Sequence, residues 1–252
     1  MGNLKNLLVY ISQTKTFSEE CSVLAKIQVD NSFSLGWQKR DIIFVTNFSW
    51  EYKGVKAIVV GDEHYCAVRP RSIKTAIVPF LIEEGIIEKG KIYWNHDFDA
   101  YQLNLMGEAE LGLNNFDAGL TDYGWRERWC MGSFFVKTSS KDIFERAKEI
   151  IFKNIEDETA MVELTKDAAI NKRCKRLNIT YDFGMRYVES NYKKAKKPLR
   201  VVHFHPKYQV VYPKPSYYWV WTWDVFVNGK NGLNKPLIDK RLIAIFNHHG
   251  IK

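Results

Sequence analysis

The stretch KIYWNHDFD, residues 91–99, decides the fold of this chain. Its first part, Lys91–Trp94, has the apolar composition of a buried β-strand. The strand leads into Asp97-Phe98-Asp99, the only Asp-x-Asp in the sequence. Two carboxylates at positions i and i+2 can meet one hard divalent cation, and such a cation can hold a diphosphate. We therefore expect Asp97 and Asp99 to be metal ligands at a strand end.

The elements before this stretch alternate between strands and helices. Apolar runs predict strands at Leu7–Ile11, Ile42–Val45 and Val55–Val60. The capping-box spacing Thr16-x-x-Glu19 predicts the start of a helix, and a second helix over Arg71–Glu84 should be interrupted at Pro79. This alternation indicates an α/β fold with a mostly parallel central sheet flanked by helices, in which ligands gather at the carboxyl ends of the strands.

The second half of the chain continues with strands and amphipathic helices. The predicted strands and extended segments are Gly132–Lys137, Asn178–Tyr181, Leu199–Phe204 and the aromatic run Tyr217–Val227. Helices should follow Ser139-Ser140, open at Asp157-Glu158, and begin at Pro236. No composition break divides the chain, so we expect a single domain over residues 1–252. Its core should span about 1–210, with a C-terminal extension at about 211–252 that carries the aromatic strand and the last helix.

Composition excludes several classes of protein. The chain has 252 residues, of which 46% are hydrophobic and 26% charged, as in soluble globular proteins. No run of about eighteen apolar residues is present, so no membrane span is expected. The N-terminus lacks the pattern of a signal peptide, and the four cysteines form no Cys-x-x-Cys. We therefore expect a cytoplasmic protein with reduced thiols.

The basic charge is concentrated in one segment. The net charge is +8, and five of the basic residues lie between Lys193 and Arg200. Such a cluster is typical of a solvated loop, and it is also the composition of a contact for a polyanion. Nucleic acid is therefore a possible partner of the segment Lys193–Arg200.

A third metal ligand is expected from a later strand. In an extended segment His203 and His205 point to the same face, and a neutral imidazole there could join two carboxylates around Mn²⁺ or a similar cation. The residues alone leave His203 and His205 both open as this ligand. Lys207, just beyond, could neutralise a phosphate, as could Arg71 before the helix that precedes the Asp-x-Asp strand.

At this point the chain resembles the GT-A-fold glycosyltransferases, and among them the glycogenin-like and lipopolysaccharide galactosyltransferase-like enzymes. The matches are short, span roughly residues 1–210, and keep the order and spacing found in that family. The segments that carry the resemblance are Ile92–Asp99, Gly132–Val136, Asp157–Ala160, and Val201–Phe204 with Lys207.

The resemblance implies a function and a set of site residues. It implies a metal-dependent transferase that moves a sugar from a UDP- or GDP-linked donor to an acceptor hydroxyl of a glycan or protein, with Mn²⁺ or Mg²⁺ as cofactor. His203 would be the third metal ligand beside Asp97 and Asp99, with His205 as the alternative. Asp157 and Glu158 would lie near the reacting carbon. Residues in contact with the nucleotide sugar would be Ser12, Gln13, Asp62, Arg71, Lys74, Gly132 and Lys207. Cys130-Met131 stand where the family has Asn-Ser, and Glu158 replaces a Gln, so the sugar and the stereochemical outcome stay open.

Two other functions are compatible with parts of the sequence. A sugar-nucleotide nucleotidyltransferase would share the nucleotide-binding architecture, although the loop Ser12–Thr16 lacks the glycines that such enzymes use. A non-catalytic module that binds nucleic acid or carbohydrate would use the basic segment together with the aromatic face of residues 217–223. This last reading leaves the paired aspartates unexplained.

Overall fold

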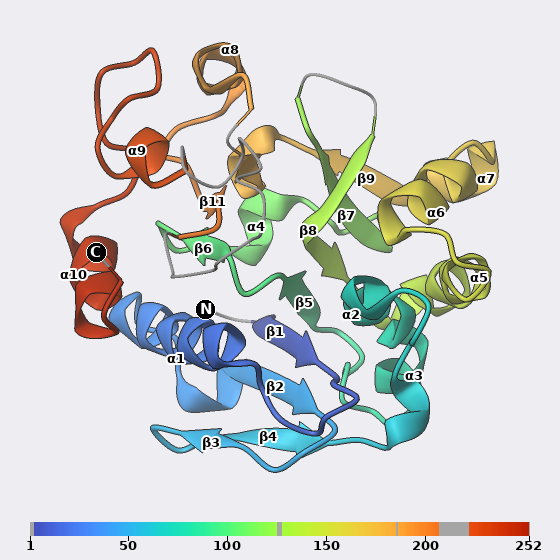
Figure 1. Ribbon diagram of the computed structural model, residues 1–252. Helices are drawn as coiled ribbons and strands as arrows, with labels where there is room; N and C mark the ends of the chain where they lie inside the picture. Colours follow the sequence, from blue (N-terminus) through green and yellow to red (C-terminus); the bar gives the residue numbers. More distant parts are fainter. Residues whose placement is uncertain (1–2, 125–127, 185, 207–221, 252) are drawn as a thin grey trace.

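A computed structural model describes residues 3–124, 128–184, 186–206 and 222–251 of the chain. Its centre is an eight-stranded sheet in the order β3-β4-β2-β1-β5-β8-β7-β9 (Figure 1). The strands of this sheet are β1 (Leu4–Tyr10), β2 (Ile42–Thr46), β3 (Glu51–Tyr52), β4 (Val55–Val59), β5 (Ile92–His96), β7 (Ala118–Asp122), β8 (Trp129–Val136) and β9 (Cys174–Leu177). Strands β4, β2, β1 and β5 run parallel, and β8 pairs antiparallel with β5. The predicted α/β class with a mostly parallel sheet is confirmed.

The central strands are buried on both faces because their side chains alternate between two hydrophobic clusters. Leu8 of β1 and Trp94 of β5 belong to one cluster, whereas Leu7 and Tyr93 belong to the other. Side chains on a strand alternate between faces, so continuous apolar runs need cover on both sides of the sheet. This is why the segments at Leu7 and Ile92 could be predicted as strands without a polar/apolar alternation.

Helices cover the two faces of the sheet (Figure 1). Helix α1 (Glu19–Ser34) contributes to the cluster on one face, and α2, α3, α5 and α6 contribute to the cluster on the other. The remaining helical bounds are α2 (Ile73–Ala76), α3 (Val78–Glu83), α4 (Glu108–Leu111), α5 (Lys141–Ile151), α6 (Asp157–Leu164), α7 (Ala168–Asn171), α8 (Val188–Lys194), α9 (Thr222–Phe226) and α10 (Lys240–His248). In the described part of the chain, no helix is long and apolar enough to cross a membrane.

A second, three-stranded sheet lies beside the carboxyl end of β5. It has the order β10-β11-β6, with β6 at Ala100–Gln102, β10 at Phe183–Gly184 and β11 at Val201–His203. Strand β6 begins directly after Asp99, and β11 pairs with it antiparallel. The chain therefore passes from the large sheet into the small one at the Asp-x-Asp.

The predicted start of the first helix needs correction, whereas the predicted break at Pro79 is confirmed. Helix α1 is capped by the Ser18 side chain, which accepts from the Cys21 amide at 3.2 Å, rather than by Thr16. The predicted interruption at Pro79 is present, since α2 ends at Ala76 and α3 begins at Val78 with proline in its first turn.

The prediction of an extended segment over Asn178–Tyr181 is wrong. Residues Ile179–Tyr181 form a single 3-10 turn. The side chain of Asn178 accepts a hydrogen bond from the Thr180 amide at 3.1 Å, which favours the turn over a strand.

The prediction of a strand over the aromatic run Tyr217–Val227 is also wrong, for the part of the run that the structure describes. Residues 217–221 lie outside the described residues, and Thr222–Phe226 form helix α9. Trp223 and Phe226 are three residues apart and both pack on the core, with the Phe226 ring stacked on Phe204 at 4.5 Å. A short aromatic run is compatible with the two-residue repeat of a strand and with the 3.6-residue repeat of a helix. Here the packing of Trp223 and Phe226 on the core stabilises the helix. The last helix begins at Lys240 rather than Pro236, because Asp239 caps it.

Candidate functional site

The two aspartates lie in a tight turn that joins the large sheet to the small one. The Ala100 amide donates to the Asp97 carbonyl at 3.1 Å, and the Asp97 amide donates to the Gly132 carbonyl on β8 at 2.9 Å. Phe98, between the two aspartates, is buried against Phe44, and helix α1 holds the turn through Gln28, whose amide donates to the Phe98 carbonyl at 2.7 Å. The apolar residue of the motif therefore anchors the turn, and both aspartates line the cavity described below.

His203 reaches the aspartates through the register of the small sheet. It lies opposite Ala100 in the β11–β6 pair, which places its ring next to Asp99. Its Nε2 atom is 3.2 Å from Asp99 Oδ1 and 3.9 Å from Asp97 Oδ2. One ligand atom from each of the three residues lies within 4.8 Å of the others. The structure thus brings together the three residues that the sequence analysis named as metal ligands.

The alternative histidine is turned to a different partner. His205 Nε2 is 2.5 Å from Glu20 Oε1 on the first turn of α1, and both side chains line the pocket described below. Among the described residues, His205 belongs to no group that places three possible metal ligands together. The geometry therefore favours His203.

The other edge of the His203 ring meets two residues that the sequence analysis did not single out. Nδ1 is 3.1 Å from Asp182 Oδ1 and 3.9 Å from Cys130 Sγ. Both partners are buried, and burial raises the pKa of the Cys130 thiol to about 12. Gly132 lies against the same ring, and a Cβ there would come within 2.0 Å of His203 Cε1. Asp182 follows the 3-10 turn that was predicted as extended, so its approach to His203 had no signal in the sequence.

Lys74 is bound to the first aspartate of the motif. Its Nζ is 2.5 Å from Asp97 Oδ1, and its side chain is only 10% exposed. Burial by itself would lower the pKa of Lys74, but Asp97 and Asp157 raise it, so the residue is a buried cation. Asn95 fixes this part of α2 by donating to the Lys74 carbonyl at 2.8 Å.

The pKa values of Asp97, Asp99 and His203 depend on their burial and on the charges of their neighbours. Loss of hydration raises the pKa of Asp97 to about 6, against the opposing effect of Lys74. Burial would raise the pKa of Asp99, yet the neighbouring His203 holds it well below its usual value. Burial would lower the pKa of His203, and Asp99 and Asp182 instead raise it well above 6.5. A protonated His203 therefore stands between the carboxylates of Asp99 and Asp182.

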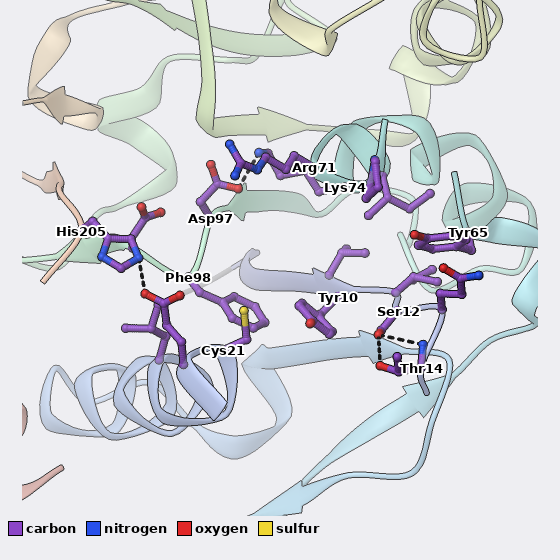
Figure 2. A pocket seen from close by; sticks show the side chains of 18 residues that line it. Tyr10, Ser12, Thr14, Cys21, Tyr65, Arg71, Lys74, Asp97, Phe98 and His205 are labelled. Atoms are coloured by element: carbon purple, nitrogen blue, oxygen red, sulfur yellow. Dashed lines mark hydrogen bonds and ion pairs between the residues drawn. The ribbon is translucent and has the colours of Figure 1, made fainter. Parts of the chain in front are cut away.

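A cavity of about 630 Å³ opens beside these residues (Figure 2). It runs from Asp97 and Asp99 to the end of β1, where Ser12, Gln13 and Thr14 line it. In Figure 2, Asp97 lies toward one end, and Ser12, Thr14 and Tyr65 lie toward the other. The cavity occupies the carboxyl ends of β1 and β5, where parallel sheets generally bind ligands.

The donor-contact residues expected from the sequence fall in different places. Ser12, Gln13, Arg71 and Lys74 line the cavity. Arg71 is exposed and forms no ion pair with any described residue, unlike Lys74. Asp62 is connected to Ser12 through Asn47, which donates from Nδ2 to Asp62 Oδ1 and to the Ser12 carbonyl, both at 2.9 Å. Lys207 lies outside the described residues, and Gly132 faces the His203 ring.

The two acidic residues at the start of α6 are held by other side chains. Asp157 is buried and accepts from the Thr75 hydroxyl at 2.8 Å, which ties α6 to α2. Glu158 pairs with Arg128 at 2.8 Å and accepts a hydrogen bond from the Tyr123 hydroxyl. Neither residue lines the 630 Å³ cavity.

The basic segment is largely engaged within the protein. Lys193 pairs with Glu189 at 2.8 Å and Arg200 with Glu110 at 2.6 Å. The Lys194 and Lys197 ammonium groups donate to backbone carbonyls, and burial lowers the pKa of Lys197. The expectation of a nucleic-acid contact over Lys193–Arg200 therefore gains no support, because these charges stabilise α8 and the loop after it.

Comparison with known proteins gives structural similarity without sequence similarity. No protein-family model and no curated protein sequence matches the chain. Solved structures do match. A glycosyltransferase involved in glycosylation of the major capsid of PBCV-1 is 12% identical, with a TM-score of 0.50 over 79% of this chain and 93% of that one.

Two further glycosyltransferase structures match only part of their own length. GlyE of Streptococcus pneumoniae TIGR4 is 12% identical, with a TM-score of 0.53 over 81% of this chain and 55% of that one. The bifunctional WbbM is 9% identical, with a TM-score of 0.50 over 81% of this chain and 46% of that one. This chain thus spans about half the length of these two proteins. At such identities the match concerns architecture, and it agrees with the resemblance expected from the sequence: the chain has the GT-A glycosyltransferase fold.

Proposed function

We propose that this protein is a glycosyltransferase that uses a nucleotide-diphospho-sugar as donor and a divalent cation as cofactor. One observation carries the proposal: Asp97 and Asp99 line one end of the 630 Å³ cavity, at the carboxyl end of β5, and His203 approaches both of them. The fold shared with solved glycosyltransferases supports the same reading. A glycan or a protein side chain is the proposed acceptor.

The donor atoms suit the proposed cofactor. Two carboxylates supply the oxygen ligands that Mg²⁺ and Mn²⁺ prefer, and the imidazole nitrogen favours Mn²⁺ over Mg²⁺. Binding requires His203 to lose its Nε2 proton, after which both carboxylates and the ring nitrogen are available. When bound, a divalent cation would supply positive charge to the departing nucleoside diphosphate.

Basic residues at the cavity would complete the binding of the diphosphate. Arg71 lines the cavity, is exposed and has no acidic partner among the described residues, so its guanidinium can pair with phosphate oxygens. Lys74 has a different role, because its contact with Asp97 keeps that carboxylate charged and oriented. Lys207 remains a predicted phosphate contact.

The nucleoside would occupy the opposite end of the cavity. The Ser12–Thr14 turn is fixed there, since the Ser12 amide donates to Asn47 Oδ1 at 2.9 Å and the Ser12 and Thr14 hydroxyls are 2.8 Å apart. Tyr65 lines the same end and offers an aromatic face to a base. Ser12, Gln13 and Asp62 remain the proposed nucleoside-side residues.

Asp157 and Glu158 remain the proposed acidic residues near the reacting carbon. The charge of Asp157 raises the pKa of Lys74, so Asp157 also stabilises the charged form of that ammonium group. Glu158 is held by Arg128 and by the Tyr123 hydroxyl, which favours a role in positioning groups over one in proton transfer.

A donor screen tests the proposal. The protein is incubated with Mn²⁺ and a panel of UDP- and GDP-sugars, and release of nucleoside diphosphate is measured, because transferases hydrolyse donors slowly without an acceptor. We expect one donor to be hydrolysed and Asp97→Asn to lower the rate at least 100-fold, since one ligand and its charge are lost.

The matched control is Asp142→Asn. Asp142 lies on α5 and pairs with Arg173, away from the cavity, so its removal should leave the rate within about twofold. Equal rates for Asp97→Asn and the wild type, or no release from any donor with glycan and peptide acceptors present, would overturn the proposal.

A further inference from the structure

The two ring nitrogens of His203 face two different sets of ligand atoms. Nε2 faces Asp97 and Asp99, whereas Nδ1 faces Asp182 and Cys130. We propose that Cys130, Asp182 and Nδ1 of His203 form a second cation site, which takes a thiophilic divalent cation such as Zn²⁺. This site is separate from the pair of aspartates and shares only the imidazole with it.

The distances match a tetrahedral zinc site. With Zn–S near 2.3 Å and Zn–N near 2.0 Å, neighbouring ligand atoms lie about 3.3–3.6 Å apart. The observed separations are 3.9 Å from Cys130 Sγ to His203 Nδ1 and 3.1 Å from Nδ1 to Asp182 Oδ1. All three ligand atoms fall within 4.8 Å of one another. Shifts of a few tenths of an ångström would close the site around one ion.

One atom of this group lacks a partner. Asp182 Oδ2 is fully buried and accepts no hydrogen bond from the described residues, which is costly for a carboxylate oxygen. Gly132 adds room, because it places no side chain against the Nδ1 edge of the ring, where a Cβ would come within 2.4 Å. A cation between these groups would satisfy the orphaned carboxylate.

The charges also balance. A thiolate, a carboxylate and a neutral imidazole together carry two negative charges, so a divalent ion leaves no net charge in this buried place. The thiol proton and the Nδ1 proton leave to solvent when the ion binds. A set of one sulfur, one nitrogen and one oxygen favours Zn²⁺ over Mn²⁺, whereas the Asp97–Asp99 side has the opposite preference.

A consequence follows that rests on the proposed function. One neutral imidazole cannot donate a lone pair from each nitrogen while one of them carries the ring proton. Zn²⁺ at Nδ1 therefore removes His203 from the Asp97–Asp99 site, and Mn²⁺ there removes it from Cys130 and Asp182. Thiophilic cations should inhibit the Mn²⁺-dependent reaction from this second site.

Cobalt(II) tests the site without any need for turnover. Thiolate ligation of Co²⁺ gives a near-ultraviolet charge-transfer band. We expect the wild-type protein to bind one Co²⁺ with this band and Zn²⁺ to abolish it by displacement. Cys130→Ser should lose the band. Cys21→Ser should keep it, although Cys21 is the thiol that lines the neighbouring cavity, and Asp97→Asn should also keep it.

A second variant guards against misfolding of Cys130→Ser. Asp182→Asn preserves shape and should weaken Co²⁺ binding 10- to 100-fold, while its circular dichroism and melting temperature stay close to those of the wild type. No band in the wild type, a band that survives Cys130→Ser, or a band lost in Cys21→Ser or Asp97→Asn would overturn the proposal. Because no donor is present, failure of this test is distinct from failure of the transferase proposal.

Discussion

Gly132 has no side chain, and the His203 ring occupies the space where one would lie. We expect Gly132→Ala to displace the ring, because the new Cβ would come within 2.0 Å of Cε1. Such overpacking should cost about 1–3 kcal/mol of stability. It should also weaken Mn²⁺ binding at least tenfold, since the imidazole moves away from Asp99. Isothermal titration with Mn²⁺ and urea denaturation would measure the two effects.

Gly184 provides the control for this substitution. It lies on β10, beside His203 in the same small sheet, yet a Cβ there meets nothing within 4 Å. Gly184→Ala should therefore leave Mn²⁺ affinity within about twofold. Equal losses of Mn²⁺ affinity in Gly132→Ala and Gly184→Ala would show that disturbance of the small sheet, and not contact with the His203 ring, causes the effect.

Some residues of the site could be predicted from the sequence, and others could not. Asp97 and Asp99 could be named because they follow an apolar strand, and His203 because the segment Val201–Phe204 resembles a strand of the GT-A family. Asp182 could not, because its position depends on a 3-10 turn and on the packing of β10 beside β11. The pairing of Lys74 with Asp97 was also unpredictable, since a helix and a strand far apart in sequence must first pack together.

At the scale of elements, α10 depends on the residue that precedes its first turn. Asp239 caps the helix, with Oδ1 accepting from the Leu242 amide at 2.8 Å. Asp239→Ala should cost about 1 kcal/mol in the free energy of unfolding, because the amide loses its partner. Asp239→Asn should cost far less, because asparagine caps equally well. Urea denaturation of both variants is the measurement, and equal destabilisation would contradict the capping role.

Strands were more predictable than helix limits for a physical reason. The apolar runs at β1, β2 and β5 are buried on both faces, so hydrophobicity alone indicated them. The start of α10 was misplaced at Pro236 because Leu237 and Ile238, which are buried, precede the helix as part of the same core. Buried apolar residues therefore do not mark the start of a helix unless a capping residue stands there as well.

At the scale of the whole molecule, Asp30 connects three segments that are distant in sequence. Its carboxylate, on α1, accepts from Lys53 at 2.6 Å, from Tyr52 at 3.2 Å and from His249 at 2.9 Å. It thereby ties the β3–β4 hairpin and the end of α10 to the same helix. Burial raises the pKa of Asp30, but the hydrogen bonds from Lys53 and His249 outweigh it, and the pKa lies below 3.8.

The sign of this shift predicts a pH dependence. A carboxyl group with a depressed pKa in the folded state contributes stability above its unfolded pKa and loses that contribution as pH falls through the folded value. Asp30→Asn should cost about 1–3 kcal/mol at pH 7. The cost should shrink as pH falls below 3.8, because protonation of Asp30 then removes the same contribution from the wild type. Urea denaturation across this range checks it, and a constant difference would contradict the assignment.

The small sheet also determines when Asp99 and His203 can come together during synthesis and folding. Asp99 and His203 meet only because β11 pairs with β6, and about a hundred residues of chain separate the two strands. A nascent polypeptide exposes both aspartates long before His203 is synthesised, and such distant contacts form late in folding. A truncated or unfinished molecule therefore carries the aspartates without the imidazole. Under the proposed function it lacks one of the three metal ligands, so it should bind Mn²⁺ more weakly than the full chain.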